Sequence, residues 1–591
     1  MASNDRSAAM RRYPPLGGVI LAAVMAMFVL PSALNVPQSN PTQTLEFAPI
    51  PPEDDDPPPP QEANLESLSL GNSSTAPSAD AEGGVGPGLP APPIPGGVGD
   101  RPVTKRCVGN PPRQTEDKLS PPCVAHFDGD NGGSTYRGVT GDEIRILVYL
   151  DGTTTAGPET DAAEAAEEGC IDLATAPDAS ETITPKYLRV FQTYFNDRYQ
   201  TYGRSARFIV CFGDSAATPE TRRADAVENL ADWDPFAVVM SQIRYGRMTD
   251  YADVMLGAGV LVFGSAAGAQ PADYFRRYPG QLWSYLPSVE EQARLYSSYV
   301  CQKVAGRPVV DSGNAGENGG PRTFGWLATT DESQPNLLLF RDVARAGIEG
   351  CGVAFAHEAT FPKAGRVTQP DNTGPAQTNI SQFQLARVTT ILWPGGFDTD
   401  HGKAATQVGY LPELIIAGDG IFDGTTGGLY QEDEWFAHAW TSTQQVYLAE
   451  DEESPCERAI DEAYPAAGTR DKDRVCSFPY YQDLRQLFTG IQVAGPDLSL
   501  ATIDRGFHAI PGTPSDDPRV AACFYNPGDY TCVKDATSEW WDPTQNTNTG
   551  CWRMVDRGRR HVADAWDDGN IDARVSEEDP CNNYSVSPLV F

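Results

Sequence analysis

Short apolar runs alternate with longer amphipathic segments from Arg137 to Gly420. The runs have the length and composition of buried parallel strands. They predict strands at 144–150, 207–212, 237–241, 260–264, 323–329, 352–356, 390–393 and 413–417. The segments between them carry apolar residues at helical spacing, as Tyr187, Phe191 and Tyr194 do in one segment. The alternation therefore predicts an α/β fold with parallel sheets flanked by helices, in which ligands bind beyond the carboxyl ends of the strands.

The stretch 274–287 is rich in aromatic residues, and its Pro and Gly residues predict that it forms no helix. It interrupts the alternation and predicts a crossing between two lobes. We expect lobe I at 137–278, lobe II at 279–420, and a return to lobe I at 421–512 through helices at 455–464, 480–495 and 500–510. The remainder, 513–591, contains four cysteines and four tryptophans. It predicts a disulfide-rich extension packed on the lobes. A separate binding module is the alternative, which an exposed tryptophan cluster would favour.

Three arginines, Arg6, Arg11 and Arg12, precede an apolar run at 16–30 that continues less regularly to residue 36. This pattern predicts that 1–36 is a signal peptide or a signal anchor. Retention as an anchor in the cell membrane is favoured, because Pro31 occupies a position where a cleavage site needs a small residue. Residues 37–136 predict an acidic, Pro- and Gly-rich linker followed by a lead-in loop.

The net charge of -36 and the pI near 4.4 disfavour a nucleic-acid partner. All twelve cysteines follow the apolar N-terminal run, and none has a zinc-type spacing. This usage predicts disulfides and an extracytoplasmic location. The cysteines expected in disulfides, mostly between sequence neighbours, are Cys107, Cys123, Cys170 with Cys211, Cys301 with Cys351, Cys456 with Cys476, Cys523, Cys532, Cys551 and Cys581.

Motifs for catalysis, nucleotides or metals are incomplete. The segment 151–157 after the first strand lacks the glycine pattern of dinucleotide-binding loops, and the chain has no P-loop. Ser215 lies in a strand-to-helix turn, but Ala217 replaces the second glycine of a nucleophile elbow. The six histidines show no zinc spacing. We therefore expect no cofactor, no metal and no enzymatic activity. A hydrolase that uses Ser215 or another nucleophile is an alternative.

Small and polar residues follow the predicted strands, where a ligand would bind. Hydroxyl groups beside helix N-termini can accept a carboxylate, an acid can take an ammonium, and an aromatic ring can pack on an apolar side chain. Together these groups describe an amino-acid site, although Ser and Asp in such positions are also common helix caps and Phe397 could belong to the core. The candidate ligand-binding residues are Ser241, Gln242, Ser265, Ala266, Gln334, Phe397 and Asp419.

Four short words, Gly138-Val-Thr-Gly-Asp-Glu-Ile-Arg-Ile, Gly264-Ser-Ala-Ala, the aromatic crossing to Trp283 and Ala417-Gly-Asp-Gly420, resemble a known family. They are similar to type I periplasmic substrate-binding proteins of the leucine/isoleucine/valine-binding branch over about 137–512. The resemblance implies a two-lobed fold in which residues after the third and fourth strands hold the ligand's carboxylate and amine. These are Ser241, Gln242, Ser265 and Ala266 here, with Phe397 and Asp419 contributed by the second lobe.

The resemblance also implies a function, which is to capture a small polar molecule between lobes that close about a hinge and to deliver it to an ABC transporter permease. A branched-chain amino acid is the default ligand. This sequence departs from the family pattern in its thinned Ser/Thr cluster, its extra cysteines and its tail, and it lacks a lipid-bearing cysteine. A membrane-anchored sensory or wall-associated receptor with the same lobes is a second alternative.

Overall fold

The computed structural model describes residues 107–582 with gaps. The gaps are 152–168, 178–180, 215–216, 241–247, 265–269, 365–371, 419–421, 425–427, 429, 477–478, 511, 513–516, 546–549, 568 and 572–577. By its contacts the chain divides into Met1–Val85 and Gly86–Phe591, and everything described below belongs to the second unit. The predicted signal or anchor at 1–36 lies outside the described residues. Among those residues, no helix combines the length and apolarity needed to cross a bilayer.

The first sheet has the strand order β2-β3-β1-β4-β5-β6. Its strands are β1 (Glu143–Asp151), β2 (Gly169–Asp172), β3 (Ser205–Gly213), β4 (Ala237–Val239), β5 (Leu261–Phe263) and β6 (Leu282–Trp283). All pairings between β3, β1, β4, β5 and β6 are parallel, and β2 is antiparallel to β3. The predicted parallel sheet is therefore present, with one antiparallel edge strand added.

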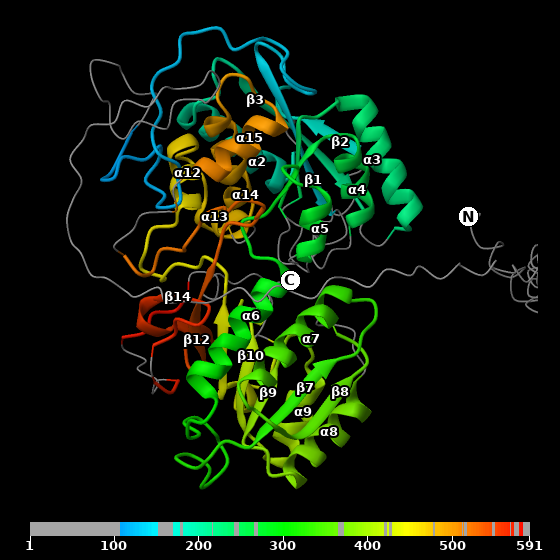
Figure 1. Ribbon diagram of the computed structural model, residues 1–591, viewed down its shortest axis with the longest axis vertical. Helices are drawn as coiled ribbons and strands as arrows, with labels where there is room; N and C mark the ends of the chain where they lie inside the picture. Colours follow the sequence, from blue (N-terminus) through cyan, green and yellow to red (C-terminus); the bar gives the residue numbers. More distant parts are fainter. Residues whose placement is uncertain are drawn as a thin grey trace, which may run out of the picture. The chain divides into compact units, whose positions relative to one another are not determined.

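Helices cover both faces of this sheet (Figure 1). They are α2 (Ile183–Arg198), α3 (Pro219–Trp233), α4 (Thr249–Gly257), α5 (Ala272–Arg277), α12 (Pro455–Ala463), α13 (Thr469–Cys476), α14 (Tyr480–Ala494) and α15 (Leu500–Ala509). Phe195 of α2 stacks on Phe488 of α14 with ring centroids 4.9 Å apart. Because buried residues of α12, α14 and α15 share one core with β1 and β3, the chain after residue 454 packs against the first sheet.

The second sheet has the order β13-β12-β11-β10-β9-β7-β8, and β14 also pairs with β12. Its parallel strands are β7 (Phe324–Thr329), β8 (Phe355–Phe361), β9 (Thr390–Trp393), β10 (Glu413–Ala417) and β11 (Ala439–Thr443). Its antiparallel strands are β12 (Asp535–Asp542), β13 (Cys551–Met554) and β14 (Arg560–Val562).

The two faces of the second sheet carry separate cores. Along β10, Leu414 and Ile416 belong to one apolar cluster and Ile415 and Ala417 to the other, which is the side-chain alternation of a strand. One face packs against α6 (Val289–Tyr299) and α7 (Pro335–Gly350), and the other against α8 (Thr373–Leu385), α9 (Asp400–Val408) and α11 (Asp433–Phe436). The described residues also include two short turns, the π-helical Val300–Val304 and the 3-10 turn Val555–Arg557.

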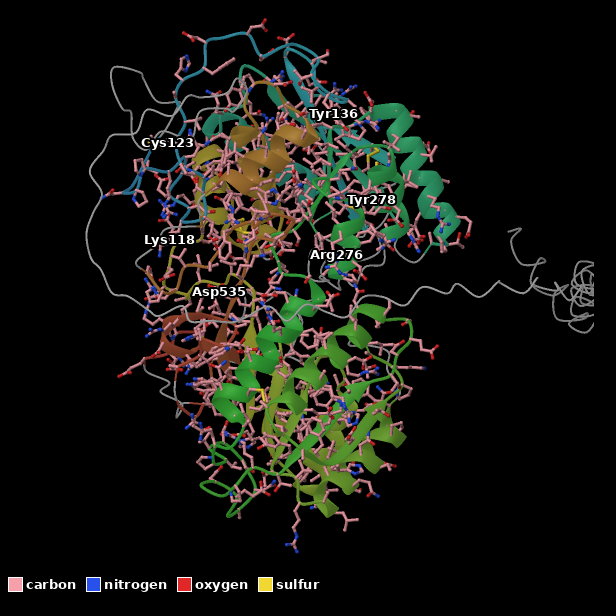
Figure 2. All side chains as sticks on the ribbon, in the orientation of Figure 1. Lys118, Cys123, Tyr136, Arg276, Tyr278 and Asp535 are labelled. Atoms are coloured by element: carbon pink, nitrogen blue, oxygen red, sulfur yellow. A yellow bond between two sulfur atoms is a disulfide. The ribbon has the colours of Figure 1, made fainter. Side chains whose placement is uncertain are left out.

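The C-terminal extension is part of the second sheet. Strand β12 pairs with β11 over four residues, from Trp440 opposite Trp540 to Thr443 opposite Thr537. Asp535 lies at the start of β12 (Figure 2). Its carboxylate accepts hydrogen bonds from Arg560 Nε at 2.8 Å and from the Ala522 amide at 2.8 Å. The four tryptophans of this region are at most 6% exposed, so no exposed tryptophan cluster supports a separate binding module.

The extension also reaches the first core. Trp283 of β6 lies 5.1 Å from Tyr525 and 5.0 Å from Tyr530, ring centroid to ring centroid. Six disulfides link sequence neighbours, and the three pairs predicted above are among them. The pairs are Cys107–Cys123, Cys170–Cys211, Cys301–Cys351, Cys456–Cys476, Cys523–Cys532 and Cys551–Cys581.

Two local expectations are wrong. The strand expected at 352–356 lies at Phe355–Phe361, where exposed and less exposed residues alternate because β8 is an edge strand. The stretch 274–287 contains the end of the helix Ala272–Arg277 and the strand Leu282–Trp283, although its Pro and Gly content predicted no helix there. The Pro and Gly residues fall after the helix has ended.

Candidate functional site

The strand order locates a candidate ligand site in each sheet. In the first sheet β1 lies between β3 and β4, and in the second sheet β7 lies between β8 and β9. In each sheet the chain therefore first adds strands on one side of β1 or β7 and then crosses to the other side of that strand. Ligands of open α/β sheets bind beyond the carboxyl ends of the strands at such a switch point. The segments after β1 and β4 lie outside the described residues, so the geometry is built from the ends of β5, β7, β9, β10 and β11.

At the switch point of the second sheet, the segments after β7 and β9 approach closely. Thr329, the last residue of β7, is 2% exposed. Gly396, after β9, has a φ of +86°, and a Cβ there would lie 3.1 Å from Thr329 Cγ2. Helix α7 begins just beyond, and its first turn contains no acidic residue. The dipole of α7 favours an anionic group at this end of the sheet.

The neighbouring helix α9 has its N-terminus already occupied by an anion. Asp398 Oδ2 accepts hydrogen bonds from the His401 amide at 3.0 Å and from His401 Nδ1. Asn372 Nδ2 donates to Asp398 Oδ1 at 2.8 Å. Burial favours the neutral acid, but these hydrogen bonds and the charge of His401 outweigh it and hold the pKa of Asp398 below its usual value. A ligand carboxylate is therefore better placed at α7 than at α9.

The ends of β10 and β11 hold a buried polar cluster. A Cβ on Gly418 would lie 2.7 Å from Asp423 Oδ2, and Thr443 Oγ1 donates a hydrogen bond to the same oxygen. Ser442 Oγ and Gln444 Nε2 are buried and have no hydrogen-bond partner among the described residues. Buried polar atoms are normally paired with protein or water. These two atoms are thus candidates for a hydrogen bond to a ligand or water.

Glu539 of β12 lies deeper in the same polar cluster. Its side chain is fully buried, and its Oε1 accepts a hydrogen bond from Asn582 Nδ2 at 2.9 Å. Burial raises the pKa of Glu539 well above 4.5, and the charge of Asp423 raises it further. The acid is therefore held in its neutral form while an exposed glutamate would be ionised.

Replacing Glu539 with glutamine is expected to remove a pH dependence of stability. Because folding raises the pKa of Glu539, its contribution is fully present below the unfolded pKa of about 4.3 and is lost as pH rises toward the folded pKa. The loss is at most about 1.4 kcal/mol for each pH unit in that window. Urea unfolding at pH 5 and pH 8 should give a smaller decrease for Glu539→Gln than for the original chain. Exposed Glu434 supplies the control, since Glu434→Gln should leave the decrease unchanged. An identical pH profile for all three proteins would contradict the assignment.

In the first sheet, a buried acid lies at the strand ends. Gly264 follows β5 with a φ of +84°, and a Cβ there would lie 2.7 Å from Asp483 Oδ2 and 3.3 Å from the backbone carbon of Met240. Asp483 belongs to α14 and is 0% exposed. Its carboxylate therefore lies beside the ends of β4 and β5. Only glycine leaves room for it there.

Of the seven predicted ligand-binding residues, the structure describes two, both after strands of the second sheet. Gln334 is 4% exposed at the N-cap of α7, and its side chain makes no capping hydrogen bond. Phe397 is 2% exposed and lies 5.3 Å from Phe422, ring centroid to ring centroid, within the core. Ser241, Gln242, Ser265, Ala266 and Asp419 lie outside the described residues, as does Ser215.

The sequence does not single out Asp483, Asp423, Ser442 or Gln444 as binding residues. Asp483 lies in a helix that is buried on nearly all sides, so no amphipathic pattern separates it from its neighbours. The stretch Ala439–Thr443 combines a tryptophan with hydroxyl residues and does not read as a buried strand. Within the described ranges, no group of three or more His, Cys, Asp or Glu side chains is arranged to hold a metal ion.

Comparisons with known proteins give structural likenesses only. No protein-family model matches the sequence, and a search of curated proteins finds no match. An ABC transporter substrate-binding protein from Aeropyrum pernix is 11% identical with a TM-score of 0.48, over 71% of this chain and 96% of that one. A solute-binding protein from R. palustris in complex with 4-hydroxybenzoate is 10% identical with a TM-score of 0.46, over 72% and 98%. A substrate-binding protein from Desulfitobacterium hafniense in complex with Leu is 13% identical with a TM-score of 0.41, over 71% and 100%.

Proposed function

We propose that this protein is an extracytoplasmic solute-binding protein that captures a small polar molecule, such as an amino acid, between its two lobes for an ABC-type importer. The observation that carries the proposal is the set of buried polar groups at the carboxyl ends of strands in both sheets. Thr329 and the start of α7 supply a place for a carboxylate in the second sheet. Asp483 supplies a place for an ammonium in the first.

The six disulfides support the extracytoplasmic location, because such bonds persist in oxidising compartments. The N-terminal segment 1–36 would hold the protein at the membrane, where a permease could receive the ligand. In this proposal Ser241, Gln242, Ser265, Ala266, Gln334, Phe397 and Asp419 complete the site around the groups described above. Closing of the lobes would remove the ligand from water.

The experiment that tests the function is ligand identification on the whole chain. Mass spectrometry of the co-purified small molecules is followed by a thermal-shift screen of the twenty amino acids, with L-leucine, L-isoleucine and L-valine as first probes. A bound ligand at a hundredfold excess over its Kd stabilises the folded state by about 2.7 kcal/mol, which is a readily measured shift. No shift with any amino acid, and no co-purified polar molecule, would contradict the proposal.

Asp483→Asn is expected to weaken binding of a zwitterionic ligand found in that screen by about 10- to 100-fold. A charge-assisted hydrogen bond contributes about 1.5–3 kcal/mol, and the amide keeps the shape of the side chain without its charge. Calorimetry with L-leucine is the first measurement. The matched control is Asp232→Asn on the exposed face of α3, which should leave the affinity unchanged. Unchanged affinity in Asp483→Asn, accompanied by a lower melting temperature of the ligand-free protein, would give Asp483 a structural role instead.

A further inference from the structure

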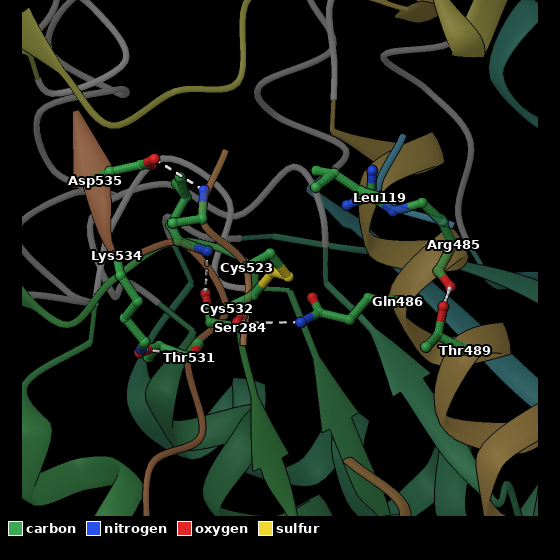
Figure 3. Close-up of a disulfide and its surroundings, with 12 residues drawn as sticks. Leu119, Ser284, Arg485, Gln486, Thr489, Cys523, Thr531, Cys532, Lys534 and Asp535 are labelled. Atoms are coloured by element: carbon green, nitrogen blue, oxygen red, sulfur yellow. Dashed lines mark hydrogen bonds between the residues drawn. A yellow bond between two sulfur atoms is a disulfide. The ribbon is translucent and has the colours of Figure 1, made fainter. Parts of the chain in front are cut away.

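The candidate ligand site at the carboxyl ends of the strands is called the strand-end site below. A cavity of about 180 Å³ lies outside it, beside the Cys523–Cys532 disulfide that Figure 3 shows. Four segments form its wall: the loop closed by Cys107–Cys123, the middle of α14, the end of α15 and the loop closed by Cys523–Cys532. The first of these segments precedes the first sheet, whereas the other three follow one another near the end of the chain, and the last belongs to the C-terminal extension. The cavity therefore forms only when the C-terminal extension packs on the first lobe.

The wall is mainly apolar. Leu119, Phe507, Ile510 and Phe524 line the cavity together with four prolines of the first loop and the disulfide sulfurs. An apolar cavity of about 150 Å³ accommodates a benzene molecule. The present cavity is larger by about 30 Å³, which is close to the share of one water molecule in the liquid. Its size thus fits a six-membered ring with one small substituent.

The charged residues on this wall are already engaged. Arg485 Nη1 donates to Asp117 Oδ2 at 3.0 Å, and both side chains are 5% exposed. Arg113, the other arginine of the wall, also has a partner. An ionised ligand would lose its hydration here without meeting an unpaired opposite charge. The cavity therefore selects against carboxylates and ammonium compounds.

Two buried polar atoms on the wall, Gln486 Oε1 and Tyr525 Oη, have no hydrogen-bond partner within the described part of the chain, and only the first is purely an acceptor. Gln486 is 4% exposed, and its Nε2 donates to the Ser284 carbonyl at 3.3 Å. Its Oε1 has no hydrogen-bond partner among the described residues. Figure 3 shows this oxygen turned toward the space between the disulfide and Leu119. A hydroxyl group on a ligand would donate to it and remove the cost of a buried unpaired acceptor.

From these observations we propose that the cavity is a second binding site, which takes one uncharged aromatic molecule of the phenol class, with the ring against the apolar wall and the hydroxyl group donating to Gln486 Oε1. The site is separate from the strand-end site and does not rest on the proposed transport function. Because the ligand would touch α14, α15 and both disulfide loops, its binding stabilises the contact between the extension and the first lobe.

The test uses calorimetry on the whole chain with phenol, toluene and benzoate as probes. Phenol and toluene should bind with a stoichiometry of one, and benzoate at least about 100-fold more weakly. Gln486→Met should lower the affinity for phenol by about 3- to 10-fold and leave the affinity for toluene unchanged, because only phenol uses the acceptor. Gln482→Met on the same helix is the matched control and should change neither. If Gln486→Met does not fold, the original chain is titrated with anisole, which has no hydrogen-bond donor. Anisole should bind about 3- to 10-fold more weakly than phenol.

Two further experiments complete the test: variants that fill the cavity, and a crystal structure that locates a bound ligand. Leu119→Trp, or Ile510→Trp as a second choice, should abolish binding of phenol and toluene. The response of the melting temperature to L-leucine should be the same in this variant as in the original chain. Crystals soaked with 4-bromophenol should place the bromine between Leu119, Phe524 and the disulfide. A bromine position elsewhere, a cavity filled by the chain itself, or equal binding of phenol before and after plugging would overturn the second site. An unchanged phenol affinity in Gln486→Met would overturn the role of the hydroxyl group.

Discussion

Replacing Arg322 with methionine is expected to lower the free energy of unfolding by about 3–5 kcal/mol, because it leaves a buried carboxylate without its cation. Arg322 Nε lies 2.7 Å from Glu413 Oε2, and Nη2 lies 3.0 Å from Oε1. The two side chains are 1% and 0% exposed. Glu413 begins β10 and also accepts a hydrogen bond from Thr390 Oγ1 of β9. The charge therefore sits where two central strands of the second sheet begin.

Equilibrium unfolding in urea gives the measurement, and two further variants separate pairing from charge. Arg345→Met removes exposed pairs with Glu358 and Glu349 and should cost no more than about 1 kcal/mol. The double variant Arg322→Met with Glu413→Gln should be more stable than Arg322→Met alone, since it removes the unpaired charge as well. A loss for Arg322→Met similar to that for Arg345→Met would show that water or another group takes over the carboxylate.

Strands that the sequence predicts well are those buried on both faces. The expected strands at 390–393 and 413–417 coincide with β9 and β10, whose residues are all buried. Such strands read as continuous apolar runs because helices cover both sides of the sheet. The edge strand β8 contains His357 and Glu358 in its middle, so polar residues interrupt its apolar run. For this reason the sequence places the strand a few residues too early, in the preceding turn.

The strands of the extension could not be predicted because their burial depends on partners elsewhere in the chain. Strand β12 contains Asp535 and Asp542, which an isolated segment would expose to water. In the fold, Asp535 pairs with Arg560 at 2.8 Å and Asp542 with Arg553 at 2.6 Å, and all four side chains are buried. Hydrogen-bonded pairing makes this burial tolerable. Only the three-dimensional pairing converts an acidic segment into a buried strand.

The candidate site also combines residues that local sequence predicts with residues that only the fold brings there. The rule that ligands bind beyond strand ends selects a candidate region from the sequence alone. Gln334 and Phe397 follow strands of the second sheet, and their role in binding stays a prediction. Asp483 arrives at the first sheet from a helix more than two hundred residues beyond Gly264 in the sequence. No local pattern encodes that approach. It arises because the chain returns to the first lobe and packs α14 against it.

Replacing Gly138 with alanine is expected to destabilise the first sheet by about 2–5 kcal/mol. Gly138 has a φ of +66°, which costs an L-residue about 1–2 kcal/mol. In addition, a Cβ there would lie 2.1 Å from the Phe236 backbone nitrogen and 2.6 Å from the Pro235 carbonyl carbon. These are backbone atoms that cannot rotate away, and such overpacking costs a further amount of about 1–3 kcal/mol. The collision occurs at the segment that leads into β4.

The matched control for this prediction is Gly133→Ala. Gly133 has the same φ of +66°, but a Cβ there would meet nothing within 4 Å. Its loss should therefore contain only the backbone term of about 1–2 kcal/mol, measured as for Gly138→Ala by urea unfolding. The Gly138 carbonyl accepts from the Arg145 amide at 2.9 Å, and the Arg145 carbonyl accepts from the Phe236 amide at 2.9 Å. Relief of the collision must thus move β1 relative to β4 at the amino ends of these two strands. Equal losses for the two alanine variants would show that the β1–β4 pairing yields without cost, and the close approach at Gly138 would then have no structural importance.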